Sequence, residues 1–222
     1  MKITLTRNEI QAALLFASRD QTRYTLCSLH VEIKPELPPL LVTTDGRRLC
    51  CIKASCPDEL PTVAESVTLD AEFLKQACQI SSAAGRKNNL IYIETDGEKA
   101  TATVIGAGVS FSKDKGVLNG YYPGWKQVLP DLNQRKAING ISLNAHYLAD
   151  YAKAKTLLGL RESSLQINFA DDLSPVEIQF HGCDYFYSVL MPMKPEAGTS
   201  RPLDFKSAFL KKYLAATPSP AN

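Results

Sequence analysis

The sequence lacks the patterns that mark a membrane protein, a metal site or a disulfide scaffold. No apolar run approaches the roughly 18–20 residues needed to cross a bilayer. No signal peptide is recognised, and the six cysteines show no Cys-x-x-Cys spacing, so reduced thiols in a cytoplasmic protein are expected. The histidines His30, His146 and His181 lie far apart, without the regular spacing of metal ligands. The sequence therefore predicts neither a metal nor a cofactor.

The usual motifs of catalysis are also missing. The sequence contains no G-x-x-x-x-G-K-[ST] phosphate loop and no G-x-S-x-G nucleophile elbow. The aspartates at 45, 96, 171 and 172 stand at predicted turns, where they have a structural explanation. An enzyme is not expected, and an unrelated enzyme on an α+β scaffold would need a cleft of titratable groups that the sequence does not reveal.

What is present describes an ordinary globular chain. Its 222 residues are enough for one large or two small domains. Hydrophobic residues make up 45% and charged residues 22% of the chain. A net charge of +2 does not by itself indicate a nucleic-acid-binding protein, but it leaves room for a basic face balanced by an acidic one.

One pattern occurs three times along the chain. Short strand-like segments begin near residues 3, 67 and 141, and each ends on a helix-capping residue: Thr6, Asp70 and Asn144. Apolar residues then recur at helical spacing, and alternating segments predict strands after each helix. The pattern predicts an α+β fold built from repeated β-α-β-β-β units. After residue 194, we expect a linker over 195–202, a short helix over 204–214 and a disordered end.

Three motifs occur in order on this background. They are T-T-D-G-R-R-L at 43–49, Y-Y-P-G-W-K-Q-V-L-P at 121–130, and Y-S-V-L-M-P-M-K at 187–194. Together they resemble the bacterial sliding clamp family, the β subunit of DNA polymerase III. Residues 1–130 resemble its complete middle domain, whereas 131–194 resemble only the second half of its last domain. The expected organisation is therefore 1–130, 131–194 and an additional tail at 195–222, in a shortened clamp with the DNA-clamp fold.

The resemblance implies a hydrophobic pocket that accepts short linear peptides of polymerases, clamp loaders or repair proteins. Methionine and proline offer adaptable apolar surface, and Arg48 is expected to present donors at the rim. The alternative for Met191 and Met193 is core packing. Gln127 departs from the family, which often has a basic residue there. By motif, the pocket residues are Leu26, Thr44, Gly46, Arg47, Arg48, Leu49, Pro123, Gln127, Val128, Val189, Met191, Pro192, Met193 and Lys194.

The resemblance also implies a channel in which the repeat helices face DNA phosphates without reading sequence. The alternative is an ordinary solvated helix face, because lysine and arginine are common there. The candidates for DNA contact are Arg19, Lys75, Arg86, Lys87, Lys153, Lys155 and Arg161.

The expected function is that of a non-enzymatic sliding clamp, a processivity factor in DNA replication or repair. A closed clamp contains twelve half-domain units and this chain has three. Four copies would complete a ring if pairs of chains joined their single half-domains, so a homo-oligomer, dimer or tetramer, is expected. The alternative is an adaptor or competitor that keeps the peptide pocket without encircling DNA.

Overall fold

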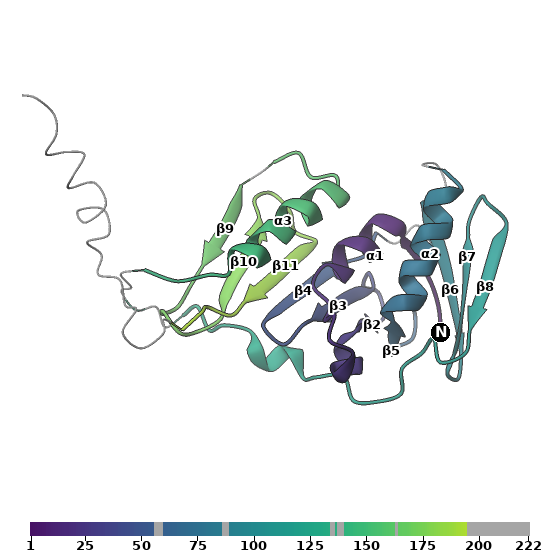
Figure 1. Ribbon diagram of the computed structural model, residues 1–222, viewed down its shortest axis with the longest axis horizontal. Coiled ribbons are helices and arrows are strands. Elements are labelled where there is room, and N and C mark those ends of the chain that lie inside the picture. The colour runs from purple at the N-terminus through teal and green to yellow at the C-terminus, as the bar shows by residue number, and fades with distance from the viewer. Residues whose placement is uncertain (56–59, 86–88, 134–135, 137–139, 163, 195–222) are drawn as a thin grey trace, which may run out of the picture.

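The computed structural model describes residues 1–55, 60–85, 89–133, 136, 140–162 and 164–194 (Figure 1). Across these ranges the chain forms two antiparallel sheets and three α-helices. The predicted α+β class is confirmed. The predicted linker, tail helix and disordered end lie outside the described residues. So do two of the predicted DNA-facing residues, Arg86 and Lys87.

Unit one, residues 2–53, begins with a strand that runs directly into a capped helix. Thr6 caps this helix as predicted and forms a capping box with Glu9, in which the Glu9 N–H donates to Thr6 Oγ1 at 3.2 Å and the Thr6 N–H donates to Glu9 Oε2 at 2.8 Å. The elements are β1 (Lys2–Thr6), α1 (Arg7–Leu14), the 3₁₀ helix η1 (Gln21–Leu26), β2 (Ser28–Ile33), β3 (Leu40–Thr44) and β4 (Arg48–Lys53).

Unit two, residues 65–113, repeats this order. Asp70 caps its helix by accepting the Phe73 N–H at 2.9 Å. Its elements are β5 (Glu65–Asp70), α2 (Ala71–Ala83), β6 (Leu90–Asp96), β7 (Lys99–Val104) and β8 (Val109–Lys113). The two units exchange strands, because β1 pairs with β6 and β5 pairs with β2.

Unit three, residues 141–190, contains α3 (Ala145–Leu157), β9 (Leu165–Asn168), β10 (Val176–Phe180) and β11 (Phe186–Leu190). Asn144 caps α3 as predicted, accepting the His146 N–H at 2.9 Å. The strand predicted over 140–144 is wrong: this segment is not a strand. In units one and two the strand before the helix pairs with a neighbouring unit. Among the described residues, unit three has no neighbour in that position.

The sheets join unit one to both of its neighbours. One sheet has the order β1-β6-β7-β8, and the other runs β5-β2-β3-β4-β11-β10-β9. The junction with unit three is the antiparallel pair β4–β11, with Leu49 opposite Val189. A short 3₁₀ helix, η2 (Trp125–Val128), lies on the connection from unit two to unit three.

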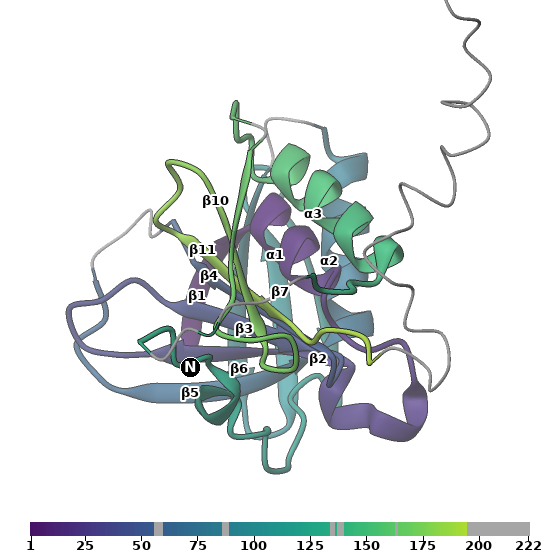
Figure 2. The ribbon, with the colours of Figure 1, turned by 90° about the vertical axis from the view of Figure 1, so that its left-hand side faces the viewer.

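The three α-helices lie beside one another on one side of the sheets (Figure 2). Helix α1 packs against both α2 and α3. The main core lies between helices and strands and includes the fully buried side chains of Leu5, Phe16, Leu69 and Tyr151. Within the described ranges, no helix combines the length and apolarity needed to cross a bilayer.

Candidate functional site

The T-T-D-G-R-R-L motif forms the turn between β3 and β4. Thr44 Oγ1 accepts the Gly46 N–H at 3.0 Å, and Asp45 Oδ1 accepts the N–H groups of Arg47 and Arg48 at 2.9 and 3.0 Å. Gly46 has φ +84, a left-handed conformation that favours glycine. The motif thus holds its own turn, with Arg47 exposed and Arg48 directed inward.

Arg48 does not serve as a donor at the rim of a pocket, which corrects the sequence interpretation. Its guanidinium donates to Asp45 at 3.0 Å, to Asp150 of α3 at 2.9 Å and to the Leu15 carbonyl at 2.7 Å. The residue is only 7% exposed. The ring of Phe16 lies 4.9 Å and that of Tyr147 lies 4.4 Å from its central carbon. Arg48 therefore ties unit one to unit three.

Beside this turn lies an apolar groove of about 170 Å³ at the junction of β4 and β11. It is smaller than the roughly 300–1,000 Å³ typical of small-molecule pockets, so it suits one or two side chains of a peptide. Ten of the fourteen predicted pocket residues line it. They are Leu26, Thr44, Gly46, Arg47, Arg48, Leu49, Pro123, Val128, Val189 and Met191.

The other four predicted residues do not line this groove. Gln127 lines a neighbouring cavity, while Pro192, Met193 and Lys194 continue the chain beyond Met191. Met191 and Met193 are 40% and 51% exposed. Core packing is therefore excluded for both methionines. Sequence reasoning missed two lining residues, Gly124 and Trp125, although both lie inside the second motif.

Trp125 is positioned by a carboxylate on β2. Its indole N–H donates to Glu32 at 2.8 Å, and Lys126 Nζ donates to the same carboxylate at 3.0 Å. Tyr122 is buried, and its hydroxyl donates to the Val42 carbonyl at 3.3 Å. These contacts hold the second motif against the outer face of the seven-stranded sheet, where it forms one wall of the groove.

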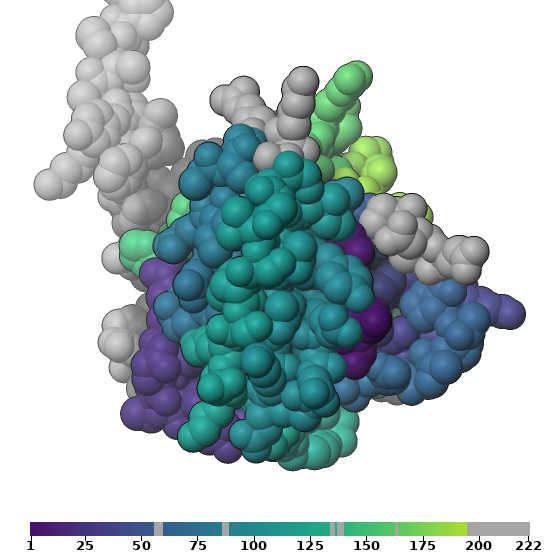
Figure 3. All heavy atoms as spheres, turned by 90° about the vertical axis from the view of Figure 1, so that its right-hand side faces the viewer, coloured from purple at the N-terminus to yellow at the C-terminus, as the bar shows by residue number. Residues whose placement is uncertain are grey.

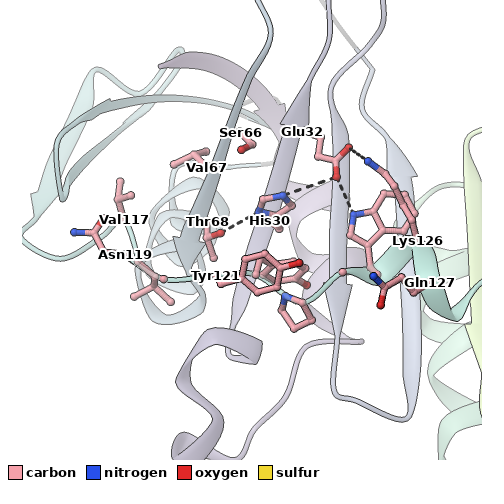
Figure 4. A pocket seen from close by; sticks show the side chains of 16 residues that line it. His30, Glu32, Ser66, Val67, Thr68, Val117, Asn119, Tyr121, Lys126 and Gln127 are labelled. Carbon is pink, nitrogen blue, oxygen red and sulfur yellow. Dashed lines mark hydrogen bonds and ion pairs between the residues drawn. The ribbon is translucent and has the colours of Figure 1, made fainter.

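A larger cavity, of about 610 Å³, continues from the groove along this outer face (Figure 4). His30 lies at its centre, stacked on Tyr122 with ring centroids 4.5 Å apart, and its Nδ1 is 3.0 Å from Thr68 Oγ1. Neither His30 nor Glu32 was predicted as a site residue from the sequence. The available signal was the alternation of β2, in which His30 and Glu32 interrupt the buried residues Leu29, Val31 and Ile33.

Three titratable side chains at these sites have shifted pKa values. Burial lowers the pKa of His30, which favours the neutral ring. Burial alone would raise the pKa of Glu32, but the hydrogen bonds from Trp125 and Lys126 outweigh it and lower that pKa. Asp150 behaves in the same way, because hydrogen bonds from Lys153 and Arg48 outweigh burial and lower its pKa. Both carboxylates are therefore ionised at neutral pH and accept hydrogen bonds from their partners in that form.

The described candidates for DNA contact lie on or just after the helices. Arg19, Lys75, Lys153 and Arg161 are exposed, and Lys155 is half-buried. Arg19 and Lys75 line one groove between α1 and α2. Lys75 is paired with Glu72 at 2.6 Å and Lys153 with Asp150 at 2.8 Å. Part of the basic charge of this face is thus neutralised by nearby acids.

Metal-binding side chains do not gather in the part of the chain that the structure describes: no group of three or more His, Cys, Asp or Glu residues there could hold an ion. The buried thiols are also poor nucleophiles. Burial raises the pKa of Cys51 and of Cys78 to about 12, so both stay protonated at neutral pH.

Solved sliding clamps share this architecture. The DNA polymerase sliding clamp of Bacillus subtilis superposes with a TM-score of 0.67 at 15% identity, covering 87% of this chain and 64% of that one. The β chain of Streptococcus pneumoniae DNA polymerase III gives 0.68 at 15% identity, covering 87% and 65%. The β subunit of Thermotoga maritima gives 0.64 at 16% identity, with the same coverages.

These likenesses show the fold: the chain has the sliding-clamp fold and spans less than two thirds of the length of the clamps it matches. No protein-family model matches the sequence, and no curated protein does so either.

Proposed function

We propose that the protein is a non-enzymatic, clamp-like scaffold that binds short linear peptides in the apolar groove at the β4–β11 junction. One observation carries the proposal. Three motifs, at 43–49, 121–130 and 187–194, are far apart in sequence, yet nine of their predicted pocket residues, together with Leu26, line a single groove. Exposed Met191 and Val128 offer adaptable apolar surface at its opening. Expected partners are polymerase, clamp-loader or repair proteins in the cytoplasm.

The peptide part is tested by the fluorescence anisotropy of a labelled clamp-binding peptide. Met191→Ala removes apolar contact from the groove, so we expect affinity to fall about tenfold, equivalent to about 1.4 kcal/mol. Met193→Ala is the matched control: it is also an exposed methionine but lies outside the groove, and its affinity is expected to stay within twofold. Equal losses in the two variants, or none in either, would place the peptide elsewhere.

We further propose that residues 1–130 act as one complete clamp domain and 131–194 as a half-domain, and that copies assemble into a ring around DNA. The exposed Arg19 and Lys75, together with Lys153, provide the phosphate-facing charge. Topological retention tests this. Protein loaded on nicked circular DNA is expected to remain bound at high salt and to slide off after linearisation, whereas equal retention on circular and linear DNA contradicts the ring.

A second candidate is an adaptor or competitor that binds clamp partners without encircling DNA. The ion pairs Lys75–Glu72 and Lys153–Asp150 favour it, because they reduce the basic charge of the helical face. Peptide binding without retention on either form of DNA would select this function.

A further inference from the structure

Units one and two complete each other by exchanging strands. The strand before each helix pairs with the first strand after the helix of the other unit: β1 with β6, and β5 with β2. Leu5 lies opposite Ile91, and Leu69 lies opposite Leu29. All four side chains are fully buried. The exchange is reciprocal, as in a twofold-symmetric contact.

Unit three has the same two elements, but among the described residues neither has such a partner. Its pre-helix segment, residues 141–144, is held on one flank, where the Met193 N–H donates to the Ser142 carbonyl at 2.8 Å. In unit two the Leu118 N–H donates to the Thr68 carbonyl, also at 2.8 Å. Thr68 and Ser142 both stand two residues before the helix cap. The segment therefore lies as β5 does, and its other flank corresponds to the side on which β5 meets β2.

The second element is β9, whose outer edge pairs with no strand in the part of the chain that the structure describes. The His181 N–H donates to the Ser164 carbonyl at 3.1 Å, continuing the β10–β9 ladder. Hydrogen bonding alternates along an antiparallel pair, so the backbone groups of Leu165 and Ile167 point away from β10. By the same alternation, those of Ile141 and Leu143 point away from Met193. Natural edge strands are often protected by charge or proline, but the sequence of β9, LQIN, contains neither.

We propose that these two edges pair with those of a second copy of the chain. In this arrangement Leu143 lies opposite Leu165 of the second copy, Ile141 lies opposite Ile167 of the second copy, and the reverse pairs form at the same time. The register follows from units one and two. There the residue before the cap, Leu5 or Leu69, meets the first buried hydrophobic residue of the partner strand, Ile91 or Leu29. Leu143 and Leu165 are the equivalent residues of unit three.

We assign a second copy of the chain as the partner of these two edges because the outer flank of 141–144 and the outer edge of β9 match each other. Each edge presents outward backbone donors and acceptors together with apolar residues at the inward positions. A single twofold axis satisfies both edges at once, as strand exchange does between units one and two. Ile167, which is 37% exposed in the single chain, would then be covered like its counterpart Ile93.

Helix α3 independently indicates that a second copy contacts unit three. In α2, Ala71, Leu74 and Cys78 are buried against unit one, and Cys78 Sγ lies 3.9 Å from the Arg7 carbonyl of α1. At the same offsets from its cap, α3 has Ala145, Leu148 and Ala152. Ala145 and Ala152 are exposed and Leu148 is half-buried. None of these side chains is charged and the two alanines are small, which allows close approach of a second α3.

The pairing goes beyond the proposed function and does not depend on it, because it requires neither DNA nor a peptide. A cysteine pair tests the register directly. Ser142 and Gln166 of the second copy would form a non-hydrogen-bonded pair, in which Cα atoms lie about 4.5 Å apart, within disulfide range. Both residues are exposed, so the substitutions leave the core intact.

All variants in this test also carry Cys56→Ser. In that background, we expect the double variant Ser142→Cys and Gln166→Cys to form a covalent dimer under mild oxidation. The off-register control combines Ser142→Cys with Asn168→Cys, which moves one cysteine by two residues, about 7 Å. A mixture of the two single variants should also cross-link, whereas neither alone should. Cross-linking of both pairs to the same extent, or of neither, overturns the proposal.

Sedimentation velocity gives an independent measure. The wild-type protein is expected at twice the chain mass of 24.4 kDa, or at a higher even multiple, and Ile167→Glu at the mass of one chain. Ile105→Glu is the matched control, since Ile105 is 42% exposed and belongs to unit two, which forms the face in Figure 3. The proposed interface is contradicted if the wild-type protein sediments with the mass of one chain at high concentration, or if the Ile167→Glu variant sediments with the same mass as the wild-type oligomer.

Discussion

Units one and two differ from unit three in one respect: within the described ranges, units one and two exchange strands with each other and unit three has no such partner. The sequences before the three helices are alike, with apolar residues alternating up to Thr6, Asp70 or Asn144. Two of these segments are strands, β1 and β5, whereas 141–144 is not. Local pattern therefore specifies which residues are able to form a strand, and a neighbouring backbone decides whether they do so.

The largest expected effect lies at the junction between the two regions. Arg48→Ala leaves the half-buried carboxylate of Asp45 and the buried carboxylate of Asp150 without their shared cation. We expect the free energy of unfolding to fall by about 3–5 kcal/mol, as for a broken buried ion pair. Arg47→Ala, at an exposed neighbouring position, is expected to change it by no more than about 0.5 kcal/mol. Urea unfolding followed by circular dichroism measures both, and similar values for the two variants would show that Arg48 does not hold the junction.

The next effect compares equivalent leucines in the two regions. Leu69 is fully buried in the exchanged strand β5, so Leu69→Ala should cost about 3 kcal/mol of unfolding free energy. Leu143 is only half-buried in a single chain, and Leu143→Ala should cost about 1 kcal/mol. Both are measured by urea unfolding in the Ile167→Glu background, which keeps the chain single. If Leu143→Ala costs as much as Leu69→Ala there, unit three is already complete without a second copy.

The smallest expected effect is the pH dependence of stability that one carboxylate in each region causes. Glu32 and Asp150 have pKa values below their ordinary values of 4.5 and 3.8. A lowered folded-state pKa stabilises the protein above the ordinary value, and this stabilisation is lost as the pH falls through the folded-state value. The stability advantage of wild type over Glu32→Gln should therefore shrink below pH 4.5, and that over Asp150→Asn below pH 3.8. Unfolding curves between pH 3 and pH 7 test this, and an advantage that is constant across that range would rule out the carboxylate charge as its cause.

Much of the fold could be predicted from local sequence because its signals are local. Thr6, Asp70 and Asn144 were predicted as helix caps, and each side chain accepts a backbone N–H in the structure. Alternating segments marked β6, β7, β10 and β11. The resemblance selected most of the groove from three short motifs, because these motifs fix their own turns, as Asp45 does through two backbone hydrogen bonds.

Other features depended on contacts between distant residues. Nothing near Arg48 in sequence indicated that its partners would include Asp150 and the Leu15 carbonyl, so the rim role expected for it was wrong. Similarly, the groups that donate hydrogen bonds to Glu32 belong to Trp125 and Lys126, which are 93 and 94 residues away in sequence. Such pairs are set by the register of β4 against β11 and by the path of the connection around η2.

The sequence by itself determined the repeated unit, the starts of its helices and the motifs that form the groove, because these depend on hydrogen bonds and side-chain alternation within a few residues. Only the tertiary structure decided that Arg48 links units one and three from a buried position and that Met191 lines the groove while Met193 does not. It also decided that residues 141–144 and the outer edge of β9 have no strand partner among the described residues. The physical reason is the same in each case: a backbone edge or a charge is satisfied by whichever group the fold brings to it.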